Sequence, residues 1–176
     1  MELGRRRSSP SFVPFDADWL QMPATSFAAR LFRDALVSGS AASVVSTLAL
    51  ALRGKRDVDD AAAPVNGPSQ WIWGRHAPYQ DGFSLKHTVV GYGIHHAASV
   101  FWAVLYELLC TGKAGVRCSP ATAAVVTSVT ANLVDFQLTP QRLRPGFEKR
   151  LSNRSLLLVY GAFALGLASV HLAQRR

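Results

Sequence analysis

The chain has 176 residues, and 19 Lys and Arg against 11 Asp and Glu give it a formal net charge of +8 at neutral pH. Every Lys and Arg falls outside four apolar runs. This segregation excludes a soluble helical bundle, whose helices carry charge on one face at every turn, and favours a multi-pass membrane protein. The basic excess then indicates loops at anionic headgroups, and the chain has no zinc-finger or RNP pattern that would point to nucleic acid as a partner.

Residues 1–24 are predicted to be a disordered tail. The basic group Arg5 to Arg7 is followed by Pro10, Pro14 and Asp16, which interrupt the apolar core that a cleavable signal peptide needs. Met22 is an alternative start, since the ordered pattern begins just after it. The ordered domain is expected to cover residues 25–176.

The four apolar runs predict four transmembrane helices, at about residues 35–52, 87–110, 120–138 and 155–173. About 20 residues at 1.5 Å per residue cross a hydrocarbon core of roughly 30 Å. The expected fold is therefore all-α, an integral membrane bundle of four transmembrane helices with short interfacial helices. The first run carries a small-residue stripe, Ala35, Gly39, Ser43 and Thr47, whose four-residue spacing lets helices approach closely within one chain or between copies in a homo-oligomer.

The connections suggest how the four helices are arranged. A short turn at 111–117 makes the second and third helices antiparallel neighbours, and Cys110 and Cys118 beside it are either a disulfide or two buried thiols. Trp71 and Trp73 are expected to anchor the long connection 54–86 at the headgroups, or to form a lid over the bundle. Residues 139–154 are expected to form a short interfacial helix. Counting Lys and Arg close to the spans places both longer connections in the cytoplasm and both termini outside.

Four polar residues lie inside the apolar runs and form a candidate binding cluster. His95 and His96 are in the second run, and Asn132 and Asp135 are in the third. Since these two helices run antiparallel, the four residues share one half of the membrane. Such a cluster could move a proton, hold a polar headgroup or fix helix packing by hydrogen bonds. Glu107, three turns beyond His96, is expected to be a solvated residue at the far end of its helix.

No cofactor, metal or catalytic residue is predicted. His95 and His96 are adjacent on a helix and point about 100° apart, which disfavours haem held between them. The chain contains no HExxH or CxxC motif that would indicate zinc or redox chemistry.

Three segments, AAAPVNGPSQWIWG, HTVVGYGIHHAASVFWAVLYE and DFQLTPQRLRPGFEKRLS, resemble small uncharacterised inner-membrane proteins of proteobacteria. The resemblance covers roughly residues 26–173 and implies a four-helix body in the bacterial inner membrane, in contact with membrane lipid. It brings no activity or site residue. The first hypothesis is a structural, assembly or small-ligand-binding bundle. The alternatives are an oligomeric proton-linked transporter or channel subunit using His95, His96 and Asp135, and a membrane enzyme acting on a lipid or isoprenoid.

Overall fold

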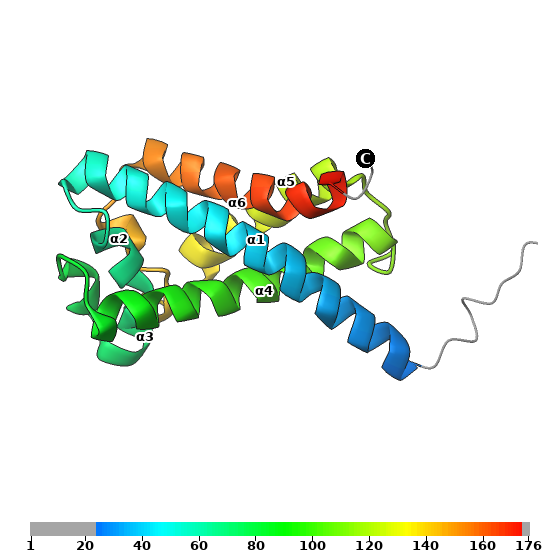
Figure 1. The fold of residues 1–176 in the computed structure, drawn as a ribbon, viewed down its shortest axis with the longest axis horizontal. Helices are drawn as coiled ribbons and strands as arrows, with labels where there is room; N and C mark the ends of the chain where they lie inside the picture. The colour runs from blue at the N-terminus through cyan, green and yellow to red at the C-terminus, as the bar shows by residue number, and fades with distance from the viewer. Residues whose placement is uncertain (1–23, 174–176) are drawn as a thin grey trace, which may run out of the picture.

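The computed structural model describes residues 24–173, and nearly all of the expected N-terminal tail lies outside them. Within this range the protein is all-helical (Figure 1). The long helices are α1 (Ala24–Val58), α4 (Val90–Thr111), α5 (Pro120–Leu133) and α6 (Asn153–Ala173). Five-residue π-helical segments extend two of them, Leu85–Val89 before α4 and Val134–Leu138 after α5. Short helices α2 (Ala63–Asn66) and α3 (Gln70–Trp73) lie in the long connection.

The long helices form an antiparallel bundle in which α1 packs between α4 and α6, and α5 completes the other side. Both long connections lie at one end of the bundle, and the turn between α4 and α5 lies at the other end (Figure 1). This is the alternating course that the short turn predicted.

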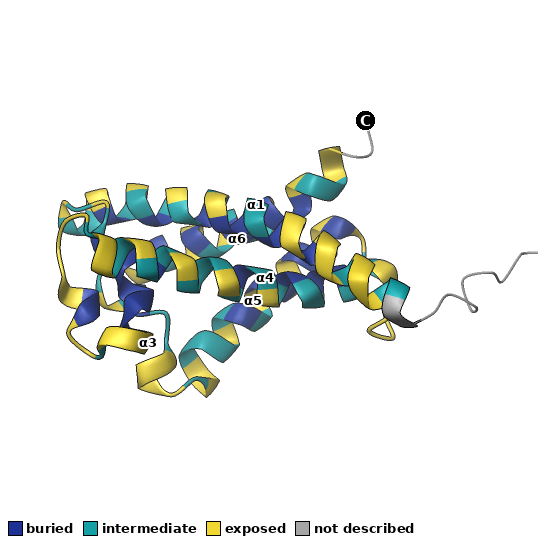
Figure 2. Cartoon of the chain, turned by 60° about the horizontal axis from the view of Figure 1, so that its bottom comes forward, coloured by how far each residue is buried: buried dark blue, intermediate teal, exposed yellow. Residues whose placement is uncertain are grey.

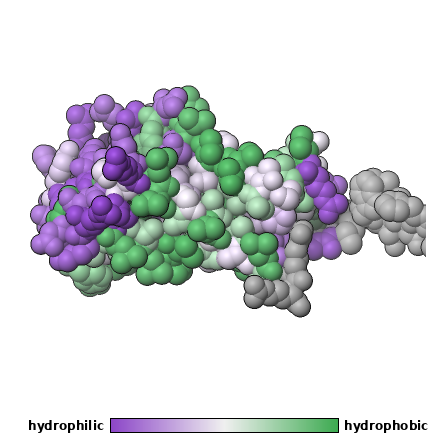
Figure 3. Space-filling view, turned by 90° about the horizontal axis from the view of Figure 1, so that it is seen from above, coloured by the Kyte–Doolittle hydropathy of each residue, from purple (hydrophilic) through white to green (hydrophobic). Residues whose placement is uncertain are grey.

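Three helices are long and apolar enough to cross a membrane: Ser26–Val58, Leu85–Thr111 and Asn153–Ala173. They include three of the four predicted spans. The fourth predicted span, 120–138, is helical along its length but is not among them, because Asn132, Asp135 and Gln137 lower its mean hydropathy. Figure 3 shows hydrophobic side chains across the middle of the visible face and hydrophilic ones at the end that carries the long connections.

The small-residue stripe faces the inside of the bundle, as the colours in Figure 2 illustrate for α1. A Cβ added at Gly39 would lie 2.6 Å from Cα of Val100 in α4, so only glycine permits this approach of the two backbones. Gly166 in α6 lies as close to α1, where an added Cβ would be 2.5 Å from Cα of Ala42. Gly39 of the stripe therefore allows α1 to pack closely against another helix of the same chain, as Gly166 does from α6.

The long connection is a packed cap on the bundle. Asn66 is fully buried, and its Nδ2 donates to the carbonyl oxygens of Gln80 (2.8 Å) and Gly82 (3.0 Å). Its Oδ1 accepts a hydrogen bond of 2.6 Å from Thr88 at the start of the second span. These bonds tie the connection to itself and to the helix that follows it.

The interfacial helix predicted for residues 139–154 is not observed. Two 3-10 turns, Gln141–Leu143 and Phe147–Lys149, replace it, because Pro145 and Gly146 interrupt the helix. Phe147 is only 3% exposed and packs inward, where it closes the end of the bundle.

Candidate functional site

A cavity of about 540 Å³ opens between α4, α5, α6 and residues 139–147. Its walls are mainly aliphatic and aromatic, with contributions from Trp71, Trp102 and Phe163. This volume lies within the range of about 300–1,000 Å³ that is typical of small-molecule sites. The polar residues of the lining are few: Ser46, His95, Ser99, Asp135, Thr139 and Tyr160.

His95 is held on one wall by Ser46 of α1, whose Oγ lies 2.9 Å from Nε2 of the ring. The Ser46 hydroxyl also lies 2.7 Å from the carbonyl oxygen of Ala42, to which it donates its one hydrogen. The Nε2–H of His95 then donates to the Ser46 oxygen. In the neutral imidazole this leaves Nδ1 as an acceptor, for which the described residues provide no donor.

Asp135 is held on the opposite side by Tyr160 of α6, whose hydroxyl donates to Oδ2 over 2.6 Å. Asp135 belongs to the π-helical segment that ends the third long helix, and such segments are frequent at functional sites. Glu148 lies close enough to interact electrostatically with Asp135, and its Oε2 is buried without a hydrogen-bond partner in the described part of the chain.

Aromatic rings connect these two polar pairs. Phe147 lies edge-on to His95 with ring centroids 6.4 Å apart, and its ring is also 6.4 Å from that of Tyr160. Phe136 packs against Tyr160 at 5.8 Å. Phe147 and Tyr160, which we call the aromatic floor, line the same cavity as His95 and Asp135.

The structure brings together only half of the predicted cluster. His95 and Asp135 line the cavity, whereas His96 and Asn132 do not. His96 packs beside the ring of Tyr92 at 5.9 Å, and its buried Nδ1 has no partner among residues 24–173. No hydrogen bond between His95 and Asp135 occurs in this range, and Asn132 does not bridge them.

The two tryptophans have different positions at the end of the bundle. Trp71 is 40% exposed, lines the cavity and donates its Nε1–H to the carbonyl oxygen of Arg144 (3.2 Å). Trp73 is 46% exposed and donates to the carbonyl oxygen of Lys86 (2.9 Å), whose ammonium group lies 5.0 Å from its ring. Their partial exposure beside α4 suits headgroup anchors, and Trp71 in addition forms part of the cavity wall.

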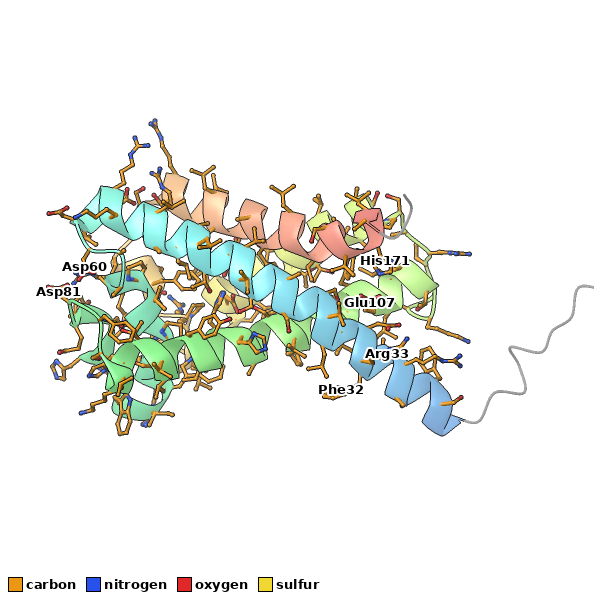
Figure 4. The ribbon with its side chains drawn as sticks, viewed as in Figure 1. Phe32, Arg33, Asp60, Asp81, Glu107 and His171 are labelled. Carbon is orange, nitrogen blue, oxygen red and sulfur yellow. The ribbon has the colours of Figure 1, made fainter. Side chains whose placement is uncertain are left out.

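A second polar cluster lies at the other end of the bundle and was missed by the sequence reasoning. Glu107 is only 3% exposed, and it accepts a hydrogen bond from Ser38 of α1 (2.8 Å) and pairs with Nε2 of His171 in α6 (3.0 Å). Figure 4 shows Glu107 and His171 close together at this end. The expectation that Glu107 is a solvated end residue is wrong, because the first and last helices cover it. The available signal was a histidine at the same depth in the last apolar run.

Cys110 and Cys118, both half-buried and within the described residues, do not form a disulfide, so the disulfide alternative is not observed. Within residues 24–173, no three His, Cys, Asp or Glu side chains gather where they could hold a metal ion.

Comparisons with protein-family models, curated proteins and solved structures find no match for this chain. The resemblance to proteobacterial inner-membrane proteins therefore stays an expectation, and the function has to be inferred from the cavity.

Proposed function

We propose that the chain is a multi-pass protein of the bacterial inner membrane whose four-helix bundle binds a small lipophilic molecule. The observation that supports this is the cavity of about 540 Å³, with apolar walls and two polar pairs, Ser46–His95 and Asp135–Tyr160. Apolar pockets with a few convergent polar groups are the usual form of small-ligand sites. Ligands in the surrounding lipid would reach the cavity without passing through water.

The transporter alternative has less support. It requires a polar path for protons, yet the walls between His95 and Asp135 are aromatic and aliphatic, and His96 lies outside the cavity. The same cavity could also serve as the active site of the enzyme alternative. This alternative needs a nucleophile that a base can activate, but the Ser46 hydroxyl beside His95 is fully buried and donates its hydrogen to the carbonyl oxygen of Ala42, so it has none for the imidazole to remove. Binding requires neither condition.

Analysis of copurified molecules tests the proposal. We expect mass spectrometry of an extract of the purified protein to find one lipophilic molecule at near-stoichiometric amounts. Ala98 lines the cavity, and Ala98→Trp is expected to fill it and remove this molecule. The matched control is Leu165→Trp, since Leu165 is 71% exposed on α6 and lies outside the cavity lining. Equal amounts of the molecule in both variants would contradict the proposal.

The proposed membrane topology includes a fourth crossing by α5 and its π-helical extension. Native Cys118 and a cysteine introduced at the exposed Arg142 would then lie on opposite sides of the membrane. In a Cys110→Ala background, we expect a membrane-impermeant maleimide to label Cys118 only from outside. With Cys118 also replaced, Arg142→Cys is expected to be labelled only from the cytoplasm. Labelling of both positions from the same side would exclude the fourth crossing.

A further inference from the structure

Asp135 is an acidic side chain of the cavity lining, and no Lys or Arg of the described residues lines the cavity. Glu148 lies close enough to Asp135 to interact with it electrostatically. A carboxylate in an apolar environment is costly without a cation or several hydrogen-bond donors, and Asp135 has one donor, Tyr160. The lining therefore favours a ligand with positive charge.

Three basic side chains of the adjoining segment have partners other than Asp135. Lys149 donates to Oε1 of Gln70 (3.0 Å), and Arg150 forms an ion pair with Asp81. Nε of Arg144 donates to the carbonyl oxygen of Thr139 (3.2 Å). These contacts hold the three basic side chains at the capped end of the bundle. None of the three lines the cavity, where it could neutralise Asp135.

The aromatic floor also suits a cation. Phe147 and Tyr160 border the space beside Asp135, and both line the cavity. Aromatic faces attract ammonium groups within about 6 Å through the ring quadrupole, most strongly where water is excluded. A carboxylate beside aromatic rings is therefore a combination that recognises alkylated ammonium ions.

We propose that the ligand is a lipophilic cation, with an ammonium group between Asp135 and the rings of Phe147 and Tyr160, and an apolar body along the walls formed by Trp102 and Phe163. This inference rests on the proposed function and adds the ligand's chemical class. An anionic amphiphile would place its charge beside Asp135 and Glu148, so the same site rejects it. An uncharged alcohol would gain hydrogen bonds but no charge pairing.

Three amphiphiles with the same chain and different heads test this inference: dodecyltrimethylammonium, dodecanol and dodecanoate. Native mass spectrometry of the detergent-solubilised full chain measures the fraction of protein that carries one bound molecule at each concentration. We expect the cation to bind at least about tenfold more tightly than the other two. Asp135→Asn, which keeps a hydrogen-bond acceptor for Tyr160, should weaken binding of the cation by roughly 10- to 100-fold. The trimethylammonium head has no N–H to donate, so this loss is that of a charge pair partly screened by its surroundings. Dodecanol binding should be unchanged by this variant.

Two further variants separate charge from structure. Asp59→Asn removes the same charge from a residue whose side chain is 89% exposed and outside the cavity, and it should leave cation binding unchanged. Glu148→Gln should also weaken binding of the cation, but by a smaller factor than Asp135→Asn. It preserves the bond from Tyr160 to Asp135, so it also covers the case in which Asp135→Asn does not fold.

The outcomes distinguish this inference from the function on which it rests. If all three amphiphiles bind equally and Ala98→Trp abolishes their binding, the cavity is a binding site and the cation inference is overturned. Tighter binding of dodecanoate, or cation binding unaffected by both Asp135→Asn and Glu148→Gln, overturns it as well. If none of the three amphiphiles binds and no molecule copurifies, the proposed function fails too.

Discussion

Replacing Glu107 by leucine tests whether the second polar cluster holds the bundle together. The buried carboxylate is the common partner of Ser38 and His171, and so it connects α4 to α1 and α6 at the end away from the cavity. Leucine has a similar size but accepts neither bond. We therefore expect Glu107→Leu to destabilise the folded bundle and to leave ligand binding in the distant cavity unchanged.

The size of this effect follows from the two bonds that are lost. An interhelical hydrogen bond in a membrane bundle contributes about 0.6–2 kcal/mol, so two of them contribute about 1–4 kcal/mol. Part of this free energy is recovered in the variant. The Ser38 hydroxyl also lies 3.0 Å from the carbonyl oxygen of Asp34 and can donate to it instead, and the leucine side chain adds apolar burial. A net loss of about 1–3 kcal/mol is expected on this basis.

Unfolding by SDS in mixed micelles, followed by circular dichroism, measures this free energy. A double-mutant cycle with His171→Leu isolates the pair, and its coupling energy should be about 0.6–2 kcal/mol. Glu107→Gln keeps one acceptor for Ser38 and should fall between the wild type and Glu107→Leu. A Glu107→Leu variant within about 0.5 kcal/mol of the wild type would refute the reasoning, since that is the behaviour of a surface residue.

Two further predictions concern the packing and the cap. Gly39→Ala should cost about 1–3 kcal/mol in the same assay, because its Cβ would lie 2.6 Å from Cα of Val100, whereas Gly161→Ala, which meets nothing within 4 Å, should be neutral or stabilising. Hydrogen bonds from the backbone N–H groups of Gly82, Ala62 and Ala63 hold the pKa of the Asp60 carboxyl below its ordinary value of 3.8. The stabilising contribution of Asp60 is therefore present above that value and is lost as the pH falls through the lower folded-state pKa. The wild type should therefore be more stable than Asp60→Asn at pH 6, and this difference should shrink at pH 3; an equal difference at both pH values would contradict the assignment.

The fold was predictable from the sequence wherever charge placement decides it. Runs without Lys or Arg gave the three long apolar helices, and the short turn before Pro120 made α4 and α5 antiparallel. Counting rise per residue along these two helices was enough to put His95 and Asp135 at one level, and they do line one cavity. The prediction of an interfacial helix was wrong because it was based on apolar spacing alone. Pro145 and Gly146 interrupt that segment, and a new turn begins after them.

The partners of the site residues could not be predicted in this way. The depth of a residue along a helix follows from counting residues at a fixed rise. The side of the helix on which it meets its neighbours depends on how the whole helix is rotated about its axis, and adjacent side chains point about 100° apart. This is why His95 reaches the cavity and Ser46, while His96 turns toward Tyr92. The same uncertainty hid Tyr160, since nothing in its local sequence distinguishes a cavity-lining tyrosine from one facing lipid.

The composition of α5 is best explained by its position beside the cavity. Val125 and Val129 of α5 are 58% and 54% exposed, whereas the polar Thr127 and Ser128 are buried, at 0% and 5%. A helix in lipid is expected to show this inverted pattern, apolar outward and polar inward. Thr127 and Ser128 therefore lower the mean hydropathy of this segment from positions that face the bundle, and Asp135 does so from the cavity lining, whereas Gln137 lies at an exposed position near its end. Valines outward and polar residues inward are the arrangement that the proposed fourth membrane crossing requires.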